Sequence, residues 1–98
     1  MVQVIANWAD VEGVVRRVTR APGGRFLMVD LLVQRVRDVD SQRNLFTNAA
    51  GKNLAIAIPE QAARTAGIRE GVSLFSRIRK AGPTSTYAHP DHVVVRKP

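Results

Sequence analysis

The sequence predicts a single all-β domain with one short helix. Several stretches alternate apolar and polar residues with the period of two that is typical of strands. Clusters of Pro, Gly, Asn and Asp separate these stretches, and only one segment carries helix signals. A chain of 98 residues with 45% hydrophobic content is long enough for one core. We therefore treat residues 1–98 as one domain, with a short extension over about residues 1–9 and a basic end at 96–98.

The first predicted strand covers residues 11–20, which are rich in the Val and Thr that suit a pleated surface. Gly13 lies inside this strand, where a glycine indicates a bulge or a sharp bend. Residues 21–24, with the sequence Ala-Pro-Gly-Gly, form the strongest turn signal in the chain. This turn predicts an antiparallel hairpin between the first strand and the next one.

The second predicted strand runs from about Arg25 to Val39 and has the clearest alternation. Apolar residues at every second position from Leu27 to Val33 point to one face. After Val33 the pattern changes face, so we expect this long strand to bend between two parts of a barrel.

A polar loop is predicted from Asp40 to Lys52, and a third strand from Asn53 to Ile58. The next segment, Pro59 to Ala66, reads as a short helix. Proline suits the first helical position, an acidic residue follows in the first turn, and Gly67 fits the end of the helix.

A turn at residues 68–71 leads to a fourth strand, predicted from Val72 to Lys80. On this strand Phe75, Arg77 and Arg79 share one side. Residues 81–91 read as a second polar loop, and residues 92–97 as a fifth strand.

The order of three strands, a short helix and two strands is that of the OB-fold, a five-stranded Greek-key barrel that binds oligonucleotides. The chain resembles the bacterial single-stranded DNA-binding protein family and its small primosomal relatives. The resemblance rests on Val11–Val15 with the turn that follows, on the long strand from Phe26 to Val39, and on the helix with the segment 67–71 after it. It implies a protein that binds single-stranded DNA in replication, recombination or mobile-element maintenance.

Two features depart from the pattern of that family. Its members usually carry aromatic residues on the third strand, where this chain has Asn53, Ala55 and Ala57. Many members also end in an acidic tail, whereas this chain ends with Arg96, Lys97 and a proline. The resemblance is therefore to the compact members that lack the tail, such as those of primosome, plasmid or phage replication.

The charge supports a nucleic-acid partner independently of the resemblance. The net charge is +7, and twelve of the fifteen basic residues are arginines. A guanidinium matches the geometry of a phosphate and stacks on bases, whereas an ammonium supplies only a point charge. The predicted binding residues combine arginines with the aromatic side chains that could stack on bases. They are Arg35, Arg37, Arg43, Phe46, Lys52, Phe75, Arg77, Arg79 and Tyr87.

Catalysis is not predicted, nor is a metal site, a cofactor or a small-molecule substrate. The chain has no cysteine, and the segment His89-Pro90-Asp91-His92 lacks further ligands, so we interpret it as a polar turn. The segment 50–53 lacks the spacing of a phosphate-binding loop. No apolar run approaches the roughly 20 residues that span a bilayer, and we expect a cytoplasmic protein that does not bind membranes.

Two alternatives remain open at this stage. The same fold could bind RNA, because the contact with the 2′-hydroxyl depends on geometry that a sequence does not reveal. The chain could also be a structural or protein-interaction subunit of a larger assembly. We expect a homodimer or homotetramer, because the core is small and the strand with Val93–Val95 has an edge that could pair. Trp8, before the first strand, is expected to cap the barrel or to contact a second copy.

Overall fold

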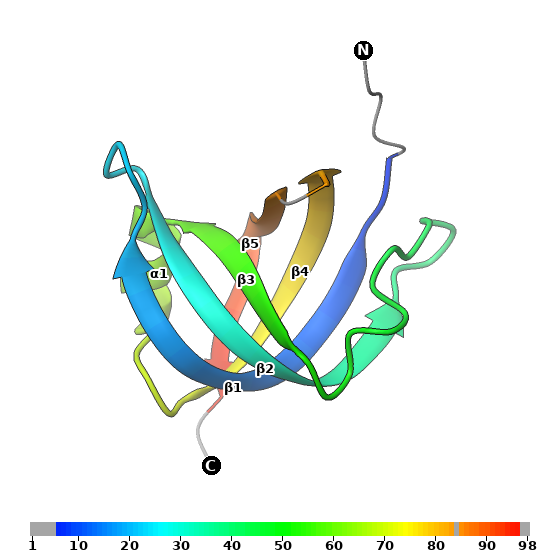
Figure 1. Cartoon of the computed structure of the whole chain (residues 1–98), viewed down its shortest axis with the longest axis horizontal. Helices are drawn as coiled ribbons and strands as arrows, with labels where there is room; N and C mark the ends of the chain where they lie inside the picture. Colours follow the sequence, from blue (N-terminus) through cyan, green and yellow to red (C-terminus); the bar gives the residue numbers. More distant parts are fainter. Residues whose placement is uncertain (1–5, 84, 97–98) are drawn as a thin grey trace.

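The computed structural model describes residues 6–83 and 85–96, and shows a five-stranded closed sheet with one short helix (Figure 1). The strand order around the sheet is β1-β2-β3-β5-β4. The predicted fold class is thus confirmed as a closed, mostly β structure with its helix between β3 and β4. The elements are β1 (Ala9–Arg20), β2 (Phe26–Asp38), β3 (Asn53–Pro59), α1 (Glu60–Ala66), β4 (Ser73–Gly82) and β5 (Ser85–Arg96).

Closure of the sheet depends on β1, which pairs with a neighbour on each side. It is antiparallel to β2 from Ala9 to Arg20, and antiparallel to β4 from Ala9 to Val14. On the other side of the sheet, β3 and β5 meet in parallel at Ala57 and Tyr87. Every strand therefore has two neighbours in the sheet, although β3 and β5 share only this short contact.

Gly13 allows β1 and β2 to approach closely, and the pairing of the two strands is irregular there, as the predicted bulge or bend requires. A Cβ atom at this position would lie 2.1 Å from the backbone oxygen of Leu32, far inside van der Waals contact. The register shifts at the same place, because Glu12 faces Arg35 while Gly13 faces Val33. Gln34 is therefore an extra residue in β2, and this bulge explains why the apolar pattern of β2 changes face after Val33.

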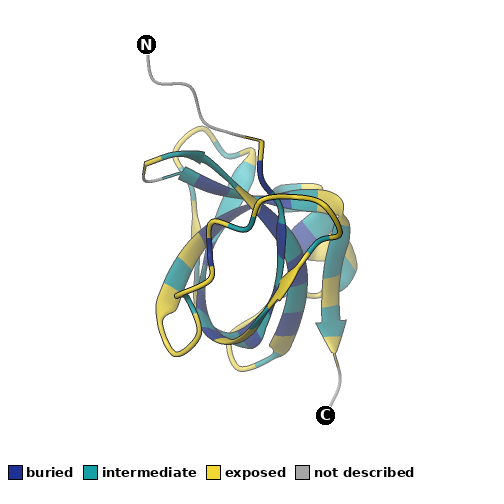
Figure 2. Ribbon diagram, turned by 90° about the vertical axis from the view of Figure 1, so that its right-hand side faces the viewer, coloured by how far each residue is buried: buried dark blue, intermediate teal, exposed yellow. Residues whose placement is uncertain are grey.

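Aliphatic side chains from alternate strand positions fill the space enclosed by the sheet. Figure 2 shows the buried positions in dark blue along the ribbons of the sheet. The predicted inward face of β2 is confirmed, since Val29, Leu31 and Val33 are buried. Every strand contributes to this buried cluster, as does α1 through Ala63. Its largest fully buried side chains are those of Leu31, Ile56, Ile58, Leu74 and Ile78.

Helix α1 forms where it was predicted and packs against β5 and β3. Gly67 follows it in the left-handed conformation, with φ of 76°, and its amide donates to the carbonyl oxygens of Ala63 and Arg64. Glycine readily adopts this left-handed conformation, and for this reason it often follows the last residue of a helix. α1 has seven residues, and the described part of the chain contains no helix with the length and apolarity that crossing a membrane requires.

The predicted loop at residues 81–91 is wrong, because this segment belongs to a hairpin. β4 continues to Gly82 and β5 already begins at Ser85, far before the predicted start at His92. Pro90 belongs to a bulge: Ser76 faces Val93 and Ile78 faces Ala88, so residues 89–92 all lie opposite Arg77. Proline is compatible with a strand at such a bulge because no ladder hydrogen bond is needed there. The predicted end of the strand at Lys97 lies outside the described residues.

The close approach at Gly13 leads to a stability prediction. Gly13→Ala should lower the free energy of unfolding by about 3 kcal/mol, because the methyl group can fit only if the backbone of β2 moves away. Gly82→Ala is a matched control, since its Cβ would meet only the side chain of Ser85, at 3.7 Å. Urea unfolding of both variants measures the difference, and equal stabilities would contradict the role assigned to Gly13.

Candidate nucleic-acid interface

The predicted binding residues do not form one surface. The structure places Arg35, Arg37, Phe75 and Arg77 together on the outer side of β2, β1 and β4. It places Arg79 beside Tyr87, where β4 pairs with β5. The prediction that Phe75, Arg77 and Arg79 share one side of β4 is confirmed. The residues that alternate with them are buried, namely Leu74, Ser76 and Ile78. β1 pairs with β4 only as far as Ile78, so Phe75 and Arg77 face β1, whereas Arg79 faces Tyr87 of β5. We therefore describe two adjoining surfaces.

The first surface consists of two rows of side chains that cross β1. One row joins Phe75, Glu12 and Arg35 through the register of the three strands. The other row joins Arg77, Asp10 and Arg37 in the same way. We call these residues, together with Arg96, the β1 surface. Its basic residues thus flank a column of two carboxylates.

Ion pairs neutralise part of the β1 surface. The Arg77 Nε donates to Asp10 Oδ1 at 2.9 Å, and its Nη2 donates to Oδ2 at 3.3 Å. This hydrogen bonding raises the pKa of Arg77 above its ordinary value. The Arg96 Nε lies 3.3 Å from Glu12 Oε1, and its guanidinium lies 5.4 Å from the centre of the Phe75 ring. A phosphate approaching Arg77, Arg96 or Phe75 would therefore meet groups that already have partners.

The second surface is built around an aromatic pair. The rings of Phe26 and Tyr87 lie edge to face, with their centres 5.6 Å apart. Met28 and Tyr87 flank Ala57 on the outer side of the sheet, since both pair with it. Ala57 is only 8% exposed although it points away from the core, so its neighbours cover it. Phe26, Met28 and Tyr87 are themselves partly exposed and form a floor of apolar side chains.

Exposed arginines surround this floor. Arg79 faces Tyr87 across β4 and β5, Arg25 precedes Phe26, and Arg17 faces Asp30 across β1 and β2. The hairpin between β1 and β2 and the end of the β4–β5 hairpin project toward the same end of the sheet, at the top of Figure 1. We call the floor and these arginines the β2–β5 surface. It combines flat apolar side chains with cations in one place.

Phe26 and Met28 were not among the predicted binding residues. The alternation of β2 already placed them on the side opposite Leu27 and Val29. The sequence signal for this surface is therefore an aromatic residue, Phe26, on the outward-facing side of a strand. The contact with Tyr87 leaves no signal in the sequence, because it joins β2 to β5, which are distant in the chain.

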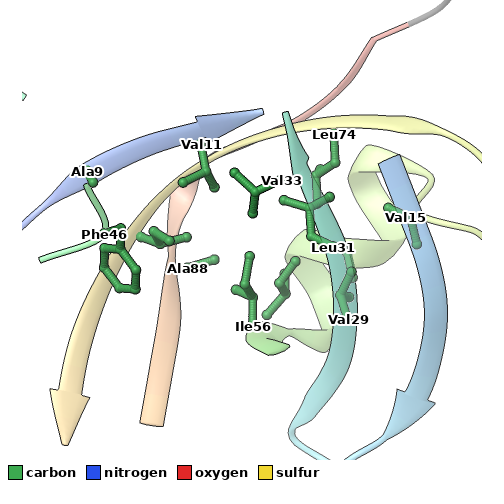
Figure 3. Packing of buried hydrophobic residues seen from close by; sticks show 13 residues of the cluster. Ala9, Val11, Val15, Val29, Leu31, Val33, Phe46, Ile56, Leu74 and Ala88 are labelled. Atoms are coloured by element: carbon green, nitrogen blue, oxygen red, sulfur yellow. The ribbon is translucent and has the colours of Figure 1, made fainter. Parts of the chain in front are cut away.

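Phe46 was predicted to stack on bases, but the structure places its ring in the core. The residue is 6% exposed and belongs to the buried cluster, near the end marked by Ala9 and Ala88 in Figure 3. The side chain of Asn44 holds this part of the loop: its Oδ1 accepts from the Phe46 amide at 2.7 Å, and its Nδ2 donates to Asp38 at 2.8 Å. The loop therefore folds inward at Phe46, and the ring is not positioned to contact a ligand.

The other two loop residues, Arg43 and Lys52, have exposed side chains, and their backbones anchor the loop. The Arg43 carbonyl oxygen accepts from the Trp8 amide at 3.1 Å, and that of Lys52 accepts from the Val33 amide at 2.9 Å. Among the described residues, no group of three or more His, Cys, Asp or Glu side chains could hold a metal ion.

Searches against protein-family models and against curated proteins found no match for this chain.

The position of Phe46 predicts that its substitution affects stability. Phe46→Ala should lower the free energy of unfolding by about 3 kcal/mol, because it removes a buried ring and leaves a cavity. The neighbouring Leu45 is 39% exposed, so Leu45→Ala should cost about 1 kcal/mol or less. Urea unfolding compares the two variants, and a small effect of Phe46→Ala would show that the ring does not contribute to the core.

Proposed function

We propose that this protein binds single-stranded DNA on the β2–β5 surface and catalyses no reaction. The observation that carries the proposal is the partly exposed pair of Phe26 and Tyr87 on the outside of the sheet, with Arg79 beside it. Rings in this position do not fill the core, and each offers apolar area on which a base can stack. Stacking contributes about 1–3 kcal/mol per base and tolerates every base, which suits a protein without sequence preference.

The topology supports the same surface. A closed sheet in the order β1-β2-β3-β5-β4, with a helix between β3 and β4, is the arrangement expected of an OB-fold. In that fold the face of the second and third strands, with the loops beside it, binds oligonucleotides. Phe26 and Met28 lie on β2 and pair with β3, so the β2–β5 surface coincides with that face.

The charges on the β2–β5 surface suit a phosphate backbone. Arg17, Arg25 and Arg79 are exposed, and the ion pairs of the described residues involve none of them. A guanidinium can bind a phosphate through two parallel hydrogen bonds. We infer that these arginines hold the backbone while the apolar floor receives the bases.

The β1 surface is less suited to the same ligand. Asp10 and Glu12 lie between its arginines, where their negative charges would repel phosphates. Arg35 and Arg37 remain exposed there and could guide a strand toward the protein, in keeping with the net charge of +7. We therefore assign direct contact to Arg79 and Tyr87 among the predicted residues, and a long-range electrostatic role to Arg35 and Arg37.

Binding should depend strongly on salt. Affinity for a labelled oligo-dT of about 35 nucleotides, measured by fluorescence anisotropy, should fall by about 0.7 log units per phosphate contact for each tenfold increase in salt. Duplex DNA should compete weakly, because its bases are not available for stacking. Stronger competition by oligo-U than by oligo-dT would assign the surface to RNA instead. Absence of binding at low salt would contradict the proposed function.

A pair of aromatic substitutions distinguishes binding on the β2–β5 surface from binding on the β1 surface. Tyr87→Ala should weaken binding of oligo-dT by about 5- to 150-fold, corresponding to the loss of about 1–3 kcal/mol of stacking. Phe75→Ala, on the β1 surface, is the matched control and should change affinity less than about twofold. Urea unfolding must show that both variants are folded under the binding conditions. A larger effect of Phe75→Ala would place the strand on the β1 surface.

A further inference from the structure

Three more rings lie outside the core, near the β2–β5 surface. The ring centres of Trp8 and His89 are 5.3 Å apart, and those of His89 and His92 are 4.7 Å apart. All three residues are partly exposed. They come from the segment before β1 and from the bulge in β5, so only the tertiary structure brings them together.

These rings continue the row that begins with Phe26 and Tyr87. Tyr87 and His89 are two residues apart in β5 and point outward, because Thr86 and Ala88, which alternate with them, are buried. Their Cα atoms are therefore separated by about 7 Å along the strand. We call the row the ring track; it consists of Phe26, Tyr87, His89, His92 and Trp8.

Local structure holds the end of the ring track in place. The bulge places four residues opposite Arg77, which lets His89 and His92 approach each other on the outer side. The Asp91 amide donates to the Nδ1 of His89 at 3.1 Å and so orients its ring. The His89 ring is thus oriented by the backbone of the bulge.

Trp8 is positioned by the residue before it. The buried side chain of Asn7 accepts from the Lys80 amide at 2.7 Å and donates to the Lys80 carbonyl oxygen at 2.9 Å. Ala9 pairs with Ile78, so Trp8 lies across from Arg79, between these two contacts. The Trp8 amide also donates to the carbonyl oxygen of Arg43. The segment is therefore fastened to β4 on one side and to the β2–β3 loop on the other.

Cations accompany the ring track along its length. Arg79 faces Tyr87 and lies across from Trp8, so it is adjacent to both parts of the track. Arg43 is exposed beside the Trp8 segment. Neither arginine takes part in an ion pair of the described residues. The opposing charges are those of Asp91, in the bulge, and of Asp10, which is bound to Arg77 opposite the bulge. Because Arg77 neutralises Asp10, the two unpaired arginines exceed the charge of Asp91.

We propose that single-stranded DNA follows the ring track from Phe26 along β5 to Trp8, and stacks bases on Trp8 and His89 as well as on the β2–β5 surface. This proposal rests on the proposed function and extends it, because it gives the strand a direction across the molecule and assigns a binding role to Trp8. Alternating rings and arginines are the combination that a sequence-tolerant strand requires. The ring track also joins residues that sequence reasoning interpreted separately, as a cap and as a polar turn.

The chain contains one tryptophan, so its intrinsic fluorescence reports on Trp8. Titration of the full chain with unlabelled oligo-dT should quench this emission, and the quenching curve should give the same dissociation constant as anisotropy of a labelled oligo-dT. Binding by anisotropy without a change in tryptophan emission would overturn the ring track while leaving the proposed function intact. Absence of binding by anisotropy at low salt would overturn both.

Substitutions provide an independent measurement that does not depend on fluorescence of Trp8. Trp8→Leu and His89→Ala should each weaken binding of labelled oligo-dT by about fivefold or more, whereas Trp8→Phe should retain most of the affinity because it keeps a ring. Phe75→Ala is again the control outside the track. Urea unfolding identifies variants that are folded under the binding conditions. Folded Trp8→Leu and His89→Ala variants with unchanged affinity would show that these rings only pack against each other, and would overturn the proposal.

Discussion

The double pairing of β1 is the constraint on which the rest of the structure depends. Residues 9–14 of this strand pair with β2 on one side and β4 on the other, which closes the sheet. That pairing requires β2 to pass close to Gly13, where any side chain would collide with the backbone of Leu32. Closure gives the inward residues a shared interior and brings β5 next to β3. The contact between Phe26 and Tyr87 exists only because these strands meet.

The narrow interior determines where the aromatic residues lie. Aliphatic side chains fill most of it, as expected for a small closed sheet whose inward positions leave little space. Of the five Phe, Trp and Tyr residues, only Phe46 is buried. Large rings on the outside of a domain lose the stabilisation that burial would provide. Three of the four outer rings, those of Phe26, Tyr87 and Trp8, lie on the ring track.

The distribution of ion pairs distinguishes surfaces that the net charge does not. Asp10 and Glu12 hold Arg77 and Arg96 on the β1 surface, and Glu60 contacts Arg20 and Arg64. Pairs with this degree of solvent contact add little to stability, so their main effect is to cancel positive charge locally. Among the described residues, no ion pair involves Arg43 or Arg79, the cations of the ring track.

The sequence by itself determined the elements whose signals are local. Alternation predicted the inward faces of β2 and β4, proline and glycine bounded α1, and Gly13 marked the irregularity in the pairing of β1 and β2. Of the predicted binding residues, Arg79 and Tyr87 lie on the surface we propose, and Phe46 does not. The tertiary structure alone decided that Phe46 folds inward, that residues 81–91 form a hairpin with a bulge, and that Trp8 lies beside His89. The positions of Phe46 and Trp8 depend on contacts between residues distant in the chain, which leave no local pattern in the sequence. The hairpin pairs residues that are close in the chain, such as Gly82 and Ser85, but the turn-forming composition of residues 81–91 favours a loop over a strand.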